Sequence, residues 1–219
     1  MKSAAKQTTL ARSYKKFIGK FPSYRLNAIV NYESLLERDF LYLLEFDHRD
    51  VVSFQARPYQ ISYMTGTKCL RFTPAFSVVR QYKKQLVEIT SAPRAAQECN
   101  QFRYRIVAQL CENEGYEFVV ITDAMIRQPP RLNNIKLLIR YQRTQINPQH
   151  QIMCHELFSV QPKISLNNVF DYFADRSVDK QVVYALIRWG IIDIDLARPI
   201  ASNSSVRLPI ASLVERKAS

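Results

Sequence analysis

Five short β-like runs follow one another between residues 51 and 89, and a helical pattern stands on each side of them. Residues 32–47 carry apolar side chains at three- and four-residue spacing, which defines one face of a helix. Residues 94–113 repeat this helical spacing before Gly115. This order predicts an α/β layer arrangement with a mixed sheet flanked by helices. The predicted strands, separated by turn-forming residues, are 51–55, 59–63, 69–72, 76–79 and 85–89.

The second half of the chain continues this order and then changes. Residues 117–122 form a short apolar run typical of a buried parallel strand, and residues 132–143 predict a basic helix. A polar stretch with Pro148 follows at residues 145–151 and predicts a domain boundary. We therefore expect three parts: a basic N-terminal arm (1–30), an α/β domain (31–150) and a small C-terminal domain (151–219).

The predicted C-terminal domain has two helices followed by a β-hairpin. Ser165 is a natural N-cap for the first helix, and Ser177 or Asp179 for the second. Strands over residues 191–195 and 206–210 would complete the hairpin. Helix, turn, helix and hairpin are the outline of a winged helix, whose second helix can enter a DNA major groove. A winged helix that docks onto protein is the alternative interpretation.

The chain carries 31 Lys and Arg against 19 Asp and Glu, which gives a formal net charge of +12. Such an excess favours polyanions, with nucleic acid first and an anionic membrane surface second. Residues 1–30 contain seven basic side chains and no acid, and residues 124–155 are also acid-free. A solvated arm and a solvated helix face would explain the same pattern. The candidate DNA-binding residues are Lys15, Lys16, Lys20, Arg57, Arg94, Lys180 and Arg188.

Several classes of protein are excluded by what the sequence lacks. No apolar run approaches the roughly 18 residues that a membrane span needs, and the N-terminus has no signal-peptide h-region. Four scattered Cys without CxxC spacing are typical of a reduced, cytoplasmic protein. His150, Cys154 and His155 lack a fourth zinc ligand, and four Gly in the chain argue against a phosphate-binding loop. We expect a cytoplasmic protein without membrane partners.

One group of residues is arranged for chemistry on phosphodiesters. Glu88 lies within an apolar strand, and a carboxylate there must be paired or liganded because an unpaired buried charge is costly. Glu88 and Thr90 share one face of that strand, and Ala75 lies at the preceding strand within hairpin reach. Glu37 lies on the first helix. Restriction-endonuclease-like nucleases place an Asp and a Glu-x-Lys in this layout, where carboxylates hold Mg²⁺.

These motifs also resemble a specific family. The helix LLERDFLYLLEFD, the strand pair DVVSFQARPYQISY and the segments FTPAFSV, LVEIT and EFVVITDAMI are similar, in order and spacing, to TnsA, the endonuclease subunit of heteromeric transposases. The resemblance covers about residues 30–127 and extends to the winged helix. It implies a restriction-endonuclease-like domain that cleaves the 5′ ends of the transposon with Mg²⁺. It also implies three partners: transposon-end DNA, the DDE transposase TnsB and the ATPase regulator TnsC.

The chain departs from the family pattern at two positions. The resemblance places the metal-binding Asp at Ala75 and the catalytic Lys at Thr90, which leaves Glu37 and Glu88 as the implied metal ligands. We therefore expect impaired Mg²⁺ binding and a weak or inactive DNA endonuclease. An inactivating substitution or natural decay of the site would each explain Ala75. The alternatives are a non-catalytic DNA-binding adaptor of a transposition complex and an unrelated nuclease-fold protein of restriction or repair.

Overall fold

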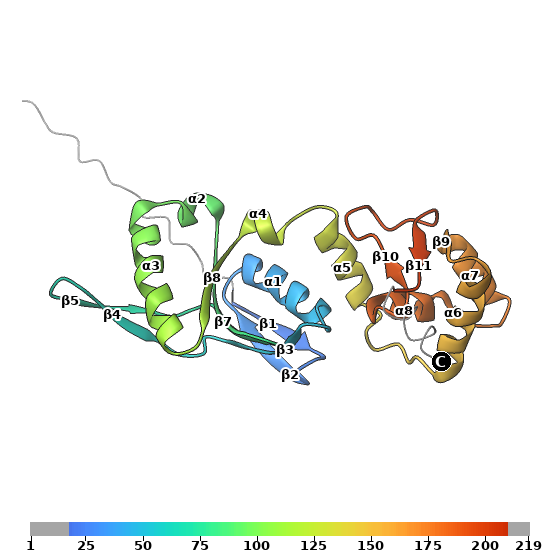
Figure 1. The fold of residues 1–219 in the computed structure, drawn as a ribbon, viewed down its shortest axis with the longest axis horizontal. Helices are drawn as coiled ribbons and strands as arrows, with labels where there is room; N and C mark the ends of the chain where they lie inside the picture. The colour runs from blue at the N-terminus through green and yellow to red at the C-terminus, as the bar shows by residue number, and fades with distance from the viewer. Residues whose placement is uncertain (1–17, 210–219) are drawn as a thin grey trace, which may run out of the picture.

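The computed structural model describes residues 18–209 and shows a mixed α/β fold, as the sequence predicts. Strands β3, β6 and β7 of its largest sheet pair antiparallel, and β8 pairs parallel to β7. This central sheet lies between helices (Figure 1). In spatial order its strands are β3 (Val51–Ala56), β6 (Phe76–Arg80), β7 (Lys84–Thr90) and β8 (Glu117–Thr122).

Two helices cover the two faces of the central sheet. Helix α1 (Leu35–Phe46) shares an apolar cluster with Val87, whereas α3 (Glu98–Asn113) shares another with Leu86. Leu86 and Val87 are consecutive in β7, and consecutive strand residues point to opposite faces of a sheet. The layers that the helical and strand periodicities predict are therefore present in the structure.

Short helices connect these layers. Helix α2 (Ala92–Ala95) precedes α3, and α4 (Asp123–Ile126) follows β8. Helix α5 (Arg131–Ile139) is shorter than the predicted helix over residues 132–143, because the chain turns after Ile139. None of the helices within residues 18–209 has the length and apolar character to cross a membrane.

A β-hairpin formed by β1 (Gly19–Ser23) and β2 (Ala28–Tyr32) packs beside α1. Phe21 and Val30 are buried in the α1 cluster. Residues 19–30, which the sequence assigns to a basic arm, are therefore folded onto the core, because apolar side chains alternate with the exposed polar ones. Residues 1–17, with Lys15 and Lys16, lie outside the described residues.

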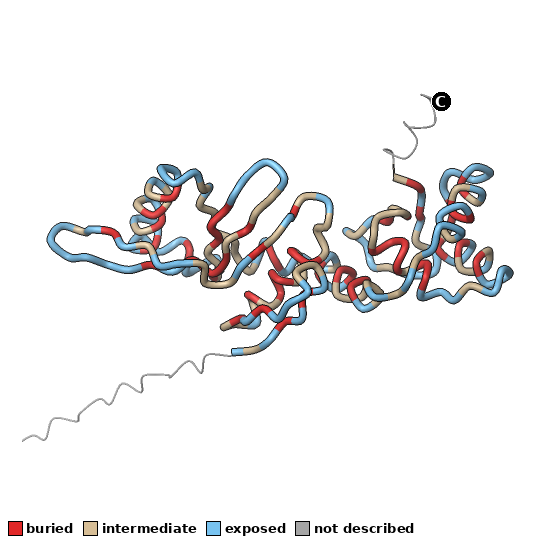
Figure 2. Tube along the Cα trace, turned by 90° about the horizontal axis from the view of Figure 1, so that it is seen from below, coloured by how far each residue is buried: buried red, intermediate tan, exposed pale blue. Residues whose placement is uncertain are grey.

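A second β-hairpin extends away from the body of the fold (Figure 1). Its strands, β4 (Ile61–Thr65) and β5 (Lys68–Phe72), pair with each other in a sheet of their own. Most of its residues are exposed (Figure 2). Tyr63, in the middle of β4, and Phe72, at the base of the hairpin, are buried in the α3 cluster and anchor one face of it.

The C-terminal part consists of helices and a small antiparallel sheet in the order β10–β11–β9, around an apolar cluster of their own. Ser165 caps α7 and Asp179 caps α8, as the sequence predicts. Strand β9 was not expected from the sequence. The elements are α6 (Pro148–Val160), β9 (Lys163–Ser165), α7 (Leu166–Ala174), α8 (Lys180–Arg188), β10 (Asp193–Ile194) and β11 (Ser205–Arg207).

Helix α6 begins inside the polar stretch that the sequence assigns to a domain boundary. The Asn147 side chain accepts a hydrogen bond from the backbone N–H of His150, and His150 Nδ1 accepts one from the backbone N–H of Asn147. Pro148 occupies the first position of the helix, where no backbone N–H is needed. His150, Cys154 and His155 therefore lie on a capped helix rather than in a linker.

Candidate functional site

An open pocket of about 450 Å³ lies where α1, the end of β3 and the strands β6 and β7 approach one another. It brings together Glu37, Ala75 and Glu88, three of the four candidate catalytic residues. Thr90 is buried at the end of β7 and does not line the pocket. The lining residues are Glu33, Glu37, Arg57, Thr73, Ala75, Glu88 and Ile89.

Glu37 is fixed in the first turn of α1. Ser34 caps the helix and accepts a hydrogen bond from the backbone N–H of Glu37 over 3.1 Å. The Oε2 atom of Glu37 accepts a hydrogen bond of 2.7 Å from the backbone N–H of Glu33. One carboxylate oxygen therefore helps to begin the helix, in a variant of the capping box, and only Oε1 is directed to the pocket.

Arg57 extends its guanidinium group into this pocket. Its Nη2 lies 2.7 Å from Glu37 Oε1 and 3.4 Å from Glu33 Oε2. Its backbone φ of 50° is in the left-handed region, which is uncommon for a residue with a side chain. Although burial opposes its charge, Glu37 and Glu33 hold the pKa of the Arg57 guanidinium above its usual value. Arg57 is therefore a fixed cation of the pocket, rather than only a surface residue.

Glu88 faces the same pocket from β7. Burial raises the pKa of Glu88 to about 7, and Glu37 adds to this rise, whereas Arg103, Arg57 and Arg94 oppose it. A substantial share of Glu88 therefore carries a proton near neutral pH. Its burial among the apolar residues of β7 disfavours the ionised form of the carboxyl group.

The lining residues, as they are arranged, do not fit a Mg²⁺ ion. Mg²⁺ demands near-octahedral oxygen ligands at about 2.0–2.1 Å. Arg57 occupies the free oxygen of Glu37, Ala75 offers only a methyl group, and the raised pKa of Glu88 makes it a poor ligand at neutral pH. Within residues 18–209, no group of three or more His, Cys, Asp or Glu could hold a metal ion.

The candidate DNA-binding residues fall into different surroundings. Lys20, Arg94 and Lys180 are exposed on β1, α2 and α8. In the part of the chain that the structure describes, none of their side chains is ion-paired to a carboxylate at 4.0 Å or less. These three cations are therefore accessible to an anionic partner.

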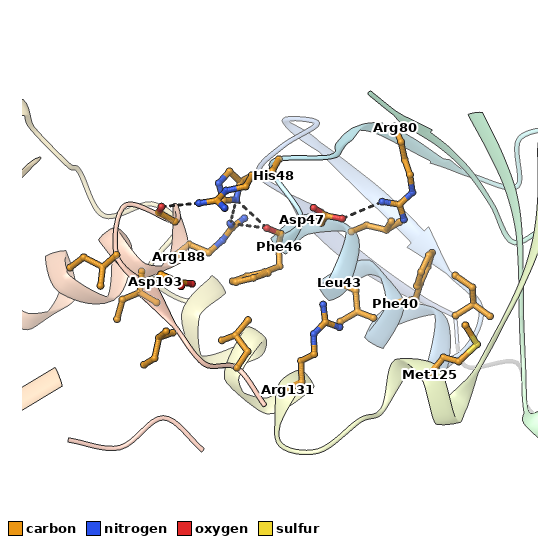
Figure 3. Close-up of a pocket in the computed structure, with 18 residues that line it drawn as sticks. Phe40, Leu43, Phe46, Asp47, His48, Arg80, Met125, Arg131, Arg188 and Asp193 are labelled. Atoms are coloured by element: carbon orange, nitrogen blue, oxygen red, sulfur yellow. Dashed lines mark hydrogen bonds and ion pairs between the residues drawn. The ribbon is translucent and has the colours of Figure 1, made fainter. Parts of the chain in front are cut away.

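Arg188 differs from this group, and its prediction as an exposed cation of α8 is wrong. Its side chain is buried, with 1% of the residue exposed. Nη2 donates to the carbonyl oxygen of Glu45 over 2.6 Å, and Nη1 donates to that of Phe46 over 3.2 Å. Arg188 thus satisfies the last carbonyl groups of α1 and joins α8 to α1. Arg188 is one of the residues that line a cavity of about 450 Å³ between α1, α5 and α8 (Figure 3).

A buried ion-pair cluster around Asp39 was not recognised in the sequence. Asp39 Oδ1 lies 2.6 Å from Lys136 Nζ, and Oδ2 lies 2.8 Å from Arg127 Nε. Two cations of the acid-free stretch over residues 124–155 are therefore neutralised by α1 rather than free for DNA. The signal in the sequence was an Asp at a buried helical position, three residues after Leu36 and four before Leu43.

No protein-family model and no curated protein matches this chain at a significant level. The pocket of Glu37, Arg57 and Glu88, together with the distribution of accessible cations, is what bears on function.

Proposed function

We propose that the chain is a TnsA-like subunit of a heteromeric DNA transposase, and that it binds DNA without cleaving it. The observation that carries this proposal is the ion pair between Arg57 and Glu37 beside Ala75. A guanidinium group in that place neutralises the carboxylate that a nuclease would use for Mg²⁺. The subunit therefore supplies DNA contacts and architecture to a transposition complex.

Hydrolysis of a phosphodiester needs a metal ion or an equivalent device to stabilise developing charge and to activate water. Thr90 carries no charge and is buried outside the pocket, so it cannot replace a catalytic Lys. Arg57 can donate hydrogen bonds to a phosphate oxygen, because 30% of its side chain is exposed, but a guanidinium does not accept a proton from water. Arg57 can therefore contact a phosphate, whereas the pocket, which is also lined by three carboxylates, lacks the groups that would cleave a phosphodiester.

The charge distribution supports DNA as the ligand. Lys20, Arg94 and Lys180 are accessible cations, and the whole chain has a formal net charge of +12. A protein that neutralises several phosphates releases their counterions, so its affinity falls steeply with salt. We expect transposon-end DNA to be bound largely through such phosphate contacts.

The order of elements supports the proposed domains. The series α1–β3–β6–β7–α3–β8, with one parallel pair at the end of the sheet, supports a restriction-endonuclease-like domain. Helices α7 and α8 followed by β10 and β11 support a winged helix. With Arg188 buried, α8 has only Lys180 and Gln181 as exposed polar residues in its first turn. This favours docking on a protein such as the ATPase TnsC, with the DDE transposase TnsB as the DNA-cleaving partner.

Fluorescence anisotropy with a labelled transposon-end duplex tests the proposal. We expect saturable binding whose affinity falls steeply between about 50 and 200 mM salt. The triple variant of Lys15, Lys16 and Lys20 to Ala should flatten the slope of log K against log salt. An unchanged slope would identify the N-terminal segment as a protein-binding element instead. Absence of duplex binding at low salt would overturn the proposed function.

A nuclease that is activated in the assembled complex is the second candidate. It is favoured by one observation: Glu37 and Glu88 line the same pocket. It requires Arg57 to leave Glu37 when DNA binds, so that a metal ion can take its place. The two candidates differ in whether DNA is cut by the complete complex.

A further inference from the structure

The β4–β5 hairpin forms a sheet of its own and extends away from the rest of the fold (Figure 1). Its two strands of five residues extend roughly 17 Å, at about 3.4 Å a residue, from an anchored base. The turn is made by Gly66 and Thr67, and Gly66 has a φ of 59°. A glycine with positive φ at the first central position is typical of the tight type II′ turn that keeps a hairpin twisted and regular. The hairpin is therefore a defined arm rather than an irregular loop.

One face of this arm is packed from its base to the middle of β4. Tyr63 and Phe72 are buried, and the Phe72 ring lies 6.4 Å from that of Tyr104 in α3. On the opposite face Met64 is 59% exposed, whereas Leu70, which is paired with Tyr63 on the packed face, is 40% exposed. The register pairs Met64 with Cys69 and Ser62 with Arg71, so these four residues share one face of the ribbon.

The arm is also cationic. Residues 51–87 contain no Asp or Glu and six Lys or Arg. Three of these, Arg57, Arg80 and Lys83, are ion-paired with carboxylates elsewhere in the fold. Lys68 and Arg71 lie on the arm, and no carboxylate within residues 18–209 forms an ion pair with either. A ribbon with two exposed cations and exposed apolar side chains is complementary in charge to a nucleic-acid groove rather than to a basic surface.

The arm begins and ends at the candidate site. Arg57, four residues before β4, and Thr73, directly after β5, both line the pocket. A duplex with one phosphate at Arg57 could therefore lie alongside the arm for about five base pairs, at about 3.4 Å a base pair. The major groove of DNA admits a two-stranded β-ribbon, and apolar side chains such as Met and Leu are used against base steps.

We infer that the β4–β5 hairpin is a DNA-binding arm, which lies in a groove of the duplex that enters the pocket of Glu37 and Arg57. Lys68 and Arg71, on opposite faces of the ribbon, contact phosphates on the two sides of the groove, while Met64 contacts its wall. The inference rests on the proposed function, because it requires duplex DNA at the pocket. It adds a second contact surface to that function and gives the direction in which the duplex leaves the pocket.

Paired charge variants test the arm. Lys68→Ala with Arg71→Ala removes both free cations, and Lys84→Ala with Arg140→Ala removes two exposed cations elsewhere as a matched control. In the anisotropy assay, the arm variant should bind duplex at least about tenfold more weakly and lose about two units of salt slope, at about 0.9 for each phosphate contact. The control pair should keep the parental slope. Equal slopes for the arm variant and the parent would overturn the inference.

Cross-linking gives an independent readout. Cys69 is exposed on the arm, Cys99 is the other exposed thiol, and Cys111 and Cys154 are buried. In a Cys99→Ser background, a thiol-linked photocross-linker on Cys69 should attach to the duplex. A parent that binds DNA while Cys69 cross-links only to a transposition protein would overturn the arm and leave the proposed function standing. A parent that binds no duplex would overturn both.

Discussion

Arg57 and Ala75 are joined twice: the backbone N–H of Arg57 and its Nη1 atom both donate to the carbonyl oxygen of Ala75, each over 3.0 Å. The side chain therefore curls back over the strand entry and reaches Glu37 from there. This arrangement explains why Arg57 tolerates a left-handed φ of 50°, since several contacts stabilise it. The cation is a built part of the pocket.

Metal binding should depend on Arg57 as well as on Ala75. Ala75→Asp places a new carboxylate beside the guanidinium, which should pair with it, so this single variant should still show no measurable Mn²⁺ or Mg²⁺ binding. In the double variant Ala75→Asp, Arg57→Met, no guanidinium neutralises Glu37 or the new Asp, so both carboxylates should bind the ion together with Glu88. Isothermal titration calorimetry measures this, with Arg57→Met alone as the control. Equal metal affinity in the single and double variants would contradict the role of Arg57.

The ion pair should also contribute to stability. Arg57→Met leaves the nearly buried Glu37 without its partner and should lower the free energy of unfolding by about 1–3 kcal/mol. Arg71→Met, which removes an exposed arginine that forms no ion pair within residues 18–209, should change it by less than about 0.5 kcal/mol. Urea unfolding at neutral pH compares the two. In a double-mutant cycle, Glu37→Gln should cost less stability in the Arg57→Met background than in the parent, and equal costs would contradict the coupling of the pair.

The free energy of unfolding should depend on pH through Glu88. Its pKa is about 7 in the folded chain against 4.5 for an ordinary Glu, so the folded state binds the proton more tightly. Stability should therefore fall as the pH rises from about 4.5 to 7 and stay level above that range. Glu88→Gln should match the parent near pH 4.5 and exceed it at pH 8 by about 1–3 kcal/mol. Thermal unfolding at both pH values checks this, and equal stabilities at pH 8 would contradict it.

Asp39 should show the opposite dependence. Although burial opposes its charge, Lys136 and Arg127 hold the pKa of Asp39 below its usual value. Its contribution is therefore present above the unfolded-state pKa, near 4, and is lost as the pH falls through the lower folded-state pKa. Asp39→Asn should cost about 1–3 kcal/mol at pH 7, with a smaller difference at acidic pH. The exposed Asp50, paired with Arg80, serves as control, because Asp50→Asn should cost under about 1 kcal/mol.

Local patterns were sufficient to predict the main layers. The helical spacing before residue 47, the alternating runs that follow and the apolar segment at residues 117–122 each correspond to an element of the structure. Where the prediction failed, a local signal had two meanings. Pro148 indicates a break in a chain, but after the capping residue Asn147 it begins α6. The basic residues near the N-terminus led to the prediction of an arm, although Phe21 and Val30 in the same segment are buried.

The site was predictable only in part, because its decisive contacts are long-range. Ala75 and Glu88 could be brought together from their strand positions, whereas Glu37 was added to them by the resemblance to TnsA. The position of the Arg57 side chain depends on the left-handed backbone of Arg57 itself, directly after β3, and no sequence signal predicts that conformation. Arg188 has the spacing of an exposed helical residue, yet its side chain is buried. It donates hydrogen bonds to two carbonyl groups of α1 that lie more than 140 residues away in the sequence.

Cleavage of transposon-end DNA tests the central claim most directly. The chain is incubated with the labelled duplex and Mg²⁺, alone and with the transposase and ATPase that we propose as its partners, and the strands are separated on a denaturing gel. We predict that the chain binds the duplex and leaves the 5′ ends of the transposon uncut in both mixtures. Mg²⁺-dependent nicking at the 5′ ends by the unaltered chain, abolished by Glu88→Gln, would contradict the account.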